Sequence, residues 1–132
     1  MSRADVEHVR RSREAWTRGD LDAFLAMAPE DAEWVIAEEN PNARTLRGRD
    51  EIGAYLRDWL DTMPNLRIDA SQDIDAGDAV VTLGTVSGQA GADGPDVTVE
   101  IAFVTRFADG RAKRTEEYLD AKQALAAVGL SG

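Results

Sequence analysis

Few residues in this chain have a type and position suited to chemistry, and a carboxylate in the last strand-like segment is the most distinctive. The alternation of residues 112–119 predicts a β-strand whose side chains point to two sides in turn. On one side, Glu117 is grouped with three other residues: Lys113, Thr115 and Leu119. If that side is apolar, desolvation raises the pKa of the Glu117 carboxyl toward neutrality, where proton transfer is most effective. Alternatively, Glu117 lies at a rim or pairs with Lys113 or an arginine, because ion pairs also perturb carboxylates.

Other groups that could act in catalysis or bind a metal are scarce. Glu116 is on the opposite side of the predicted strand, where we expect it to be solvated or at a sheet interface. His8 is the only histidine and lies off the apolar stripe of its helix, so a solvated or flanking position is favoured over a ligand role. Cysteine is absent, which excludes thiolate catalysis. Glu38 and Glu39 lack companion histidines, so we predict neither a metal nor a cofactor.

Four aromatic residues could stack on a planar ligand: Trp16, Trp34, Tyr55 and Trp59. Aromatic side chains at helical or strand spacing also serve as ordinary core, and this alternative stays open for all four. Trp34 and Trp59 are the preferred pocket candidates.

Composition limits the class of protein. The 132 residues suit a single domain spanning residues 1–132. A net charge of −10 disfavours nucleic acid and anionic membrane surfaces as partners. The N-terminal residues carry charges every few positions and lack the apolar stretch of a signal peptide, and no segment is long and apolar enough to span a membrane. The expected location is therefore cytoplasmic.

Hydrophobic periodicity predicts helices in the first half of the chain and long strands in the second. The expected helices cover residues 4–17, 21–28, 50–63 and 121–128, with Asp20 and Asp50 as N-caps of the second and third. The expected strands cover residues 31–37, 66–74, 79–88, 97–107 and 112–119. Glycine-containing turn signals at residues 75–78 and 109–110 join strands as hairpins, and residues 89–95 form a mobile loop.

This order of elements resembles the nuclear transport factor 2-like superfamily, including its SnoaL-like and ketosteroid isomerase-like branches, over nearly the whole chain. The resemblance depends on residues 16–22, 31–34, 47–52, and 107–111 followed by 116–120. It implies an α+β fold in which a curved, cone-shaped antiparallel sheet carries the N-terminal helices on its concave side. It also implies an apolar pocket for a small hydrophobic molecule.

The resemblance implies that alternate strand residues line this pocket. The candidates, with two aromatic residues of the third helix, are Trp34, Ile36, Tyr55, Trp59, Thr82, Gly84, Val86, Ile101, Phe103, Thr105, Lys113, Thr115, Glu117 and Leu119. In SnoaL-like cyclases and limonene epoxide hydrolases, a carboxylate near this point of the last strand is a general acid or base. Glu117 matches that position.

The chain departs from two known chemistries of the superfamily. Ketosteroid isomerases take their base from the first strand, where this sequence has Ile36. Their acidic and tyrosine oxyanion donors fall on Phe103 and near Ser12. Epoxide hydrolases add an Arg-x-Asp pair, but Gly84 and Val86 stand at those positions. Neither mechanism therefore has all its parts.

The expected function is that of a cofactor-independent lyase, isomerase or cyclase, or a hydrolase, with Glu117 as the single acid or base. Enolisation, aldol-type cyclisation and dehydration are compatible with this arrangement. The alternatives are a non-catalytic binder of a small apolar ligand and a dimeric interaction scaffold. The superfamily often forms homodimers through outward strand residues, which here are Thr98, Glu100, Ala102, Val104 and Arg106.

Overall fold

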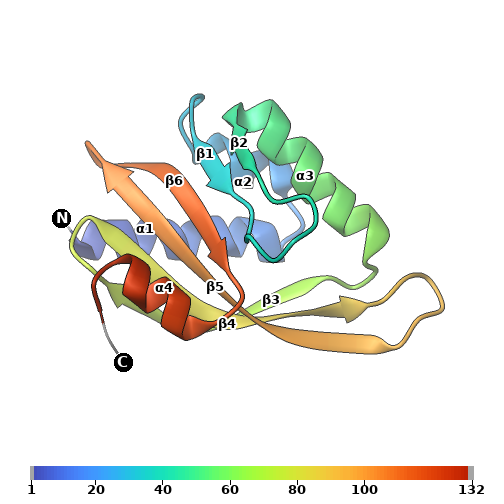
Figure 1. Ribbon diagram of the computed structural model, residues 1–132. Coiled ribbons are helices and arrows are strands. Elements are labelled where there is room, and N and C mark those ends of the chain that lie inside the picture. Colours follow the sequence, from blue (N-terminus) through green and yellow to red (C-terminus); the bar gives the residue numbers. More distant parts are fainter. Residues whose placement is uncertain (1, 131–132) are drawn as a thin grey trace.

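The computed structural model describes residues 2–130, which form four helices and six strands (Figure 1). The helices are α1 (Ser2–Thr17), α2 (Leu21–Ala26), α3 (Gly48–Thr62) and α4 (Ala121–Ala127). The strands are β1 (Glu33–Val35), β2 (Thr45–Arg47), β3 (Arg67–Asp75), β4 (Ala79–Gln89), β5 (Asp96–Ala108) and β6 (Arg111–Tyr118). The predicted order of elements is confirmed, and β2 is an additional strand that the sequence pattern did not predict.

The six strands form one curved, open sheet in the order β2-β1-β6-β5-β4-β3. Neighbouring strands are antiparallel except β1 and β6, which run parallel, with Trp34 beside Thr115. The expectation of an antiparallel sheet is thus wrong for this one pair. Parallel neighbours need a long connection, and here the whole of the chain between β1 and β6 provides it.

The N-terminal helices cover the concave face of the sheet, as predicted, whereas α4 lies on the opposite face (Figure 1). The main core between helices and sheet contains Trp34, Ile36, Leu46, Ile52 and Leu56. Helices and strands bury their apolar sides against one another in this core, which is the usual basis of a layered α+β fold. No helix in residues 2–130 combines the length and apolarity needed to cross a membrane.

The starts of the two helices that frame the cavity differ from each other. Asp20 caps α2 as predicted, because its Oδ1 accepts the backbone N–H of Ala23 at 3.0 Å. The predicted N-cap of α3, Asp50, is wrong, since β2 runs directly into the helix and Arg47 occupies the cap position. The backbone N–H of Arg47 donates to Glu51 Oε1 at 2.9 Å. Asp50 is instead in the first turn, where a negative charge still favours the helix.

On the convex face, α4 covers the middle of the sheet. Ala124 packs against Ala102 and Val104, and all three are fully buried. Glu116 is also buried and accepts hydrogen bonds from Arg106 at 2.8 Å and from Arg114 at 3.0 Å. Of the two positions expected for Glu116, solvated or at a sheet interface, the solvated one is wrong, because α4 and these arginines enclose the side chain. Ala102 and Val104 were expected to face a partner copy, and this is wrong because α4 covers them. Pairing of two copies through the rest of this face stays a prediction.

Candidate functional site

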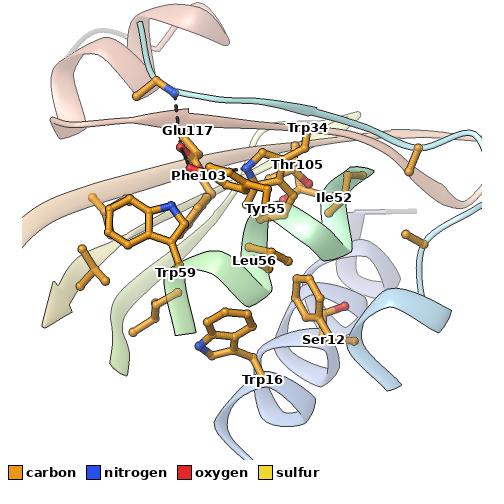
Figure 2. Close-up of a pocket in the computed structure, with 18 of the residues that line it drawn as sticks. Ser12, Trp16, Trp34, Ile52, Tyr55, Leu56, Trp59, Phe103, Thr105 and Glu117 are labelled. Atoms are coloured by element: carbon orange, nitrogen blue, oxygen red, sulfur yellow. Dashed lines mark hydrogen bonds between the residues drawn. The ribbon is translucent and has the colours of Figure 1, made fainter. Parts of the chain in front are cut away.

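A cavity of about 1330 Å³ lies between the helices and the concave face of the sheet (Figure 2). Most of the predicted pocket residues line it: Trp34, Tyr55, Trp59, Thr82, Val86, Ile101, Phe103, Thr105, Thr115, Glu117 and Leu119. They come from α3 and from the inward sides of β1, β4, β5 and β6, except for Leu119, which directly follows β6. Strand alternation therefore predicted most of the wall, whereas the roles of these residues in binding stay predictions.

Glu117 projects from β6 into this cavity and accepts hydrogen bonds from three protein groups. The indole Nε1 of Trp34 donates to Oε2 at 2.6 Å, and the backbone N–H of Ala37 donates to Oε1 at 3.3 Å. The hydroxyl of Tyr55 lies 3.0 Å from Oε1 and 2.9 Å from Oε2. Side chains from β1 and α3 thus hold both oxygens in place (Figure 2).

The surroundings of Glu117 favour its neutral form more than water does. Burial raises the pKa of its carboxyl, and the hydrogen bonds from Trp34, Tyr55 and Ala37 oppose this without cancelling it. Within residues 2–130, no Lys, Arg or His nitrogen lies within 4.0 Å of the carboxylate. Lys113, the partner considered from the sequence, is instead 3.4 Å from Asp31. Glu117 is therefore a carboxyl without an ion-pair partner.

Tyr55 is suited to remain a hydrogen-bond donor. Burial raises the pKa of its hydroxyl, and the nearby negative charge of Glu117 raises it further. The hydroxyl is therefore protonated throughout the neutral pH range. The hydroxyl proton of Tyr55 can therefore be donated to either oxygen of Glu117, because the hydroxyl lies at nearly the same distance from both.

Aromatic rings form the apolar walls around this carboxylate. Trp34 makes edge-to-face contacts with Phe24 and Phe103, with ring centroids 6.4 Å and 5.9 Å apart. On α3, the rings of Tyr55 and Trp59 meet at nearly right angles, with centroids 6.5 Å apart. Such contacts restrain the rings, which present flat apolar surfaces to a ligand.

A second polar group of residues lies at the α1 side of the cavity and was not predicted. Arg13 of α1 donates two hydrogen bonds to Asp73 of β3, at 2.9 Å and 2.7 Å. Thr82 of β4 donates to Asp73 Oδ1 at 2.8 Å. The charge of Arg13 is therefore neutralised by Asp73, and this ion pair links α1 to the sheet. Asp73 and Thr82 are direct neighbours across the β3–β4 hairpin, a pairing that counting back from the turn could have found.

The Arg13–Asp73 pair gives a testable pH dependence of stability. Burial raises the pKa of Asp73, but hydrogen bonds from Arg13 and Thr82 outweigh it and leave the pKa below its ordinary value. A depressed carboxyl pKa stabilises the fold above the pKa of the unfolded chain, and this contribution is lost as pH falls through the folded value. Asp73→Asn is therefore expected to lower the free energy of unfolding by about 2 kcal/mol at neutral pH, with the difference from wild type shrinking in acid.

Urea unfolding at several pH values measures this effect. Asp93→Asn, in an exposed loop, is the matched control and is expected to stay close to wild type at each pH. A constant difference between Asp73→Asn and wild type down to strongly acidic pH would contradict the assigned linkage.

Three predicted pocket residues do not line the cavity. Ile36 is buried in the core beyond the end of β1, and the backbone of Ala37 reaches the cavity instead. The side chain of Lys113 is 42% exposed and points to Asp31. Gly84 lies against β3, where an added Cβ would be 2.2 Å from the carbonyl oxygen of Asp69. That close approach leaves no room for the arginine of an epoxide hydrolase pair.

His8 lies at the wall of the cavity in a flanking position. Its ring contacts Phe107 edge-to-face, with centroids 5.6 Å apart. Burial lowers the pKa of the imidazole, so it is neutral at physiological pH. Ser12 also lines the cavity (Figure 2). Its hydroxyl donates to the sulfur of Met27 at 3.6 Å.

The sequence profile of the SnoaL-like domain family matches residues 9–115, which include all strands up to the middle of β6. The chain belongs to the SnoaL-like domain family. The resemblance to the nuclear transport factor 2-like superfamily is thereby confirmed. No curated protein matches the chain.

Solved structures with the same fold support this membership. An NTF2-like protein from Burkholderia pseudomallei is 27% identical, with a TM-score of 0.79, and the alignment covers 96% of this chain and 98% of that one. An NTF2-like protein from Burkholderia thailandensis is 26% identical, with a TM-score of 0.78 and coverage of 93% and 95%. TerC, co-crystallised with polyporic acid, is 23% identical, with a TM-score of 0.78 and coverage of 95% and 98%. At that identity the likeness to TerC shows the fold alone.

Within the SnoaL-like family the fold is shared, so the chemistry of this member depends on its own cavity residues. Here the most distinctive of those are the carboxylate of Glu117 with its three hydrogen-bond donors, the aromatic rings around it, and hydroxyl groups on the sheet.

Proposed function

We propose that this SnoaL-like domain binds a small, largely apolar molecule in its cavity and that Glu117 removes or returns a proton on it. The corresponding activity is that of a cofactor-independent isomerase, lyase or cyclase. The environment of Glu117 supports this most: its carboxylate faces an apolar cavity, lacks an ion-pair partner within residues 2–130, and has a raised pKa. These conditions bring a carboxylate closer to the basicity needed at neutral pH.

The hydrogen-bond pattern leaves room for a substrate proton. A carboxylate offers about four acceptor positions, and the donors on Glu117 are one N–H each from Trp34 and Ala37 and one O–H from Tyr55. One position therefore stays free for a proton from the ligand. Removal of a proton next to a carbonyl group leaves the electron pair on an enolate. Return of that proton to a second carbon completes an isomerisation, and loss of a leaving group completes an elimination.

A second candidate function is binding without catalysis. The observation in its favour is that protein donors already hold both oxygens of Glu117, as they would in a purely structural role. In that case the domain would hold or sequester an apolar ligand, and removal of the carboxylate would change binding little.

A probe that needs only a base separates the two functions. When a base removes the ring C–H proton of a nitrobenzisoxazole, the N–O bond breaks and a coloured cyanophenolate forms. We expect the protein to open this ring faster than acetate at the same carboxylate concentration, because a desolvated carboxylate is the stronger base. Saturable binding without acceleration over acetate would contradict catalysis and support the binding function.

A further inference from the structure

We propose that Thr105 and Thr115 form a subsite that binds an oxygen atom of the ligand, and that the ligand is a neutral molecule with a carbonyl or hydroxyl group. The subsite rests on the proposed function only in requiring that a small molecule occupies the cavity. It does not require that Glu117 is a catalyst.

The two threonines lie side by side on the wall of the cavity that the sheet forms. Thr105 of β5 and Thr115 of β6 are direct cross-strand partners, and the next inward pair along the same strands is Phe103 and Glu117. Both threonines line the cavity, and Trp34 is the neighbour of Thr115 on the other side. Cross-strand partners have Cβ atoms about 5 Å apart, so one ligand oxygen can reach both hydroxyls. Figure 2 shows Thr105 and Glu117 on the same wall of the cavity.

Neither hydroxyl is used by the protein within residues 2–130. In the described residues, the side chains of Thr105 and Thr115 form no hydrogen bond with another protein group. The hydroxyl of Thr82, on the neighbouring strand, differs because it donates to Asp73. Thr105 is only 9% exposed. In the described residues, every fully buried side-chain oxygen or nitrogen has a hydrogen-bond partner. Because the Thr105 hydroxyl has none, its oxygen is not fully buried, and it opens onto the cavity that Thr105 lines. A partly enclosed hydroxyl without a protein partner favours a ligand that supplies a hydrogen-bonding group.

The distance between Glu117 and Thr115 along the strand, and the charges around the cavity, indicate which kind of ligand fits. Glu117 and Thr115 are two residues apart on one strand, which separates their Cα atoms by about 6.7 Å. The ligand oxygen and the proton that faces Glu117 are therefore expected at two different positions of the same small molecule. Of the arginines that line the cavity, Arg13 is neutralised by Asp73 and Arg44 is exposed. Within residues 2–130, the salt bridges include none to Glu117, so no cation beside this carboxylate is placed to balance an anionic ligand. Hydroxyls both donate and accept, so they suit a neutral carbonyl or hydroxyl oxygen.

A matched pair of probes tests the subsite by binding alone. The probes are a naphthol and the methylnaphthalene substituted at the same position, titrated into the protein while backbone amide shifts are followed by NMR. Thr105→Val and Thr115→Val remove one hydroxyl each at almost constant volume, and Thr98→Val on the outward side of β5 is the control. We expect each inward variant to bind the naphthol about tenfold more weakly, with methylnaphthalene binding unchanged.

The outcomes separate this inference from the proposed function. Equal naphthol affinity in wild type and both inward variants would overturn the subsite and leave the cavity function intact. Equal loss of both probes would also overturn it, because the change would then reflect packing. Failure of both probes to bind wild-type protein would contradict the cavity function together with the subsite.

Discussion

Replacing Glu117 with glutamine is expected to lower the nitrobenzisoxazole-opening rate by a factor of about 10² to 10⁴, the usual contribution of a general base. Glutamine has nearly the same shape and retains one oxygen for the donor hydrogens of Trp34 and Tyr55. It cannot accept the substrate proton. The variant is therefore expected to fold and bind the probe while losing the proton-transfer step, which appears as a fall in kcat rather than a rise in KM.

The control for this result is Glu14→Gln, the same chemical change at an exposed position of α1. It is expected to leave the rate unchanged, which excludes an effect of net charge alone. Circular dichroism and the probe titration verify folding and binding of both variants. A Glu117→Gln protein that opens the probe at the wild-type rate would show that another group is the base.

Replacing Leu46 with alanine is expected to lower the free energy of unfolding by about 2–5 kcal/mol, the usual cost of an alanine in place of a buried leucine. Leu46 is 1% exposed and packs in the main core with Trp34 and Ile52. It is the central residue of β2, so a cavity there also weakens the edge of the sheet beside β1.

Urea unfolding followed by tryptophan fluorescence measures this loss. Leu60→Ala is the matched control, because Leu60 on α3 is 41% exposed and its truncation is expected to change the free energy of unfolding by no more than about 0.5 kcal/mol. Equal stability of the two variants would contradict the assignment of Leu46 to the core.

The long elements were predictable because their signals are local. Residues 97–107 and 112–119 follow a two-residue period closely enough to predict β-strands, and glycine turn signals join such strands. β2 has only three residues, too few for a periodicity to show, and its pairing with β1 depends on a loop of irregular sequence. The parallel contact between β1 and β6 brings together residues about 80 positions apart, which local patterns do not encode.

The same distinction applies to the cavity. Alternation placed Glu117, Thr105 and Phe103 on one wall, since parity within a strand is a local property. The error at Ile36 arose because β1 ends at Val35, after which the alternation no longer holds. The contacts of Glu117 with Tyr55 and the backbone of Ala37 depend on how α3 and the end of β1 approach β6, so the sequence identified the carboxylate but not the full set of its donors.

The most direct test of Glu117 as the base is the pH dependence of nitrobenzisoxazole opening by the wild-type protein. Because the carboxylate form is the base, the rate is expected to rise with pH through the pKa of Glu117, with a midpoint above the ordinary glutamate value of about 4.3. An NMR titration of the Glu117 carboxyl is expected to give the same midpoint. A rate midpoint at or below the ordinary value, or one that differs from the Glu117 titration, would contradict the assignment of Glu117 as the base.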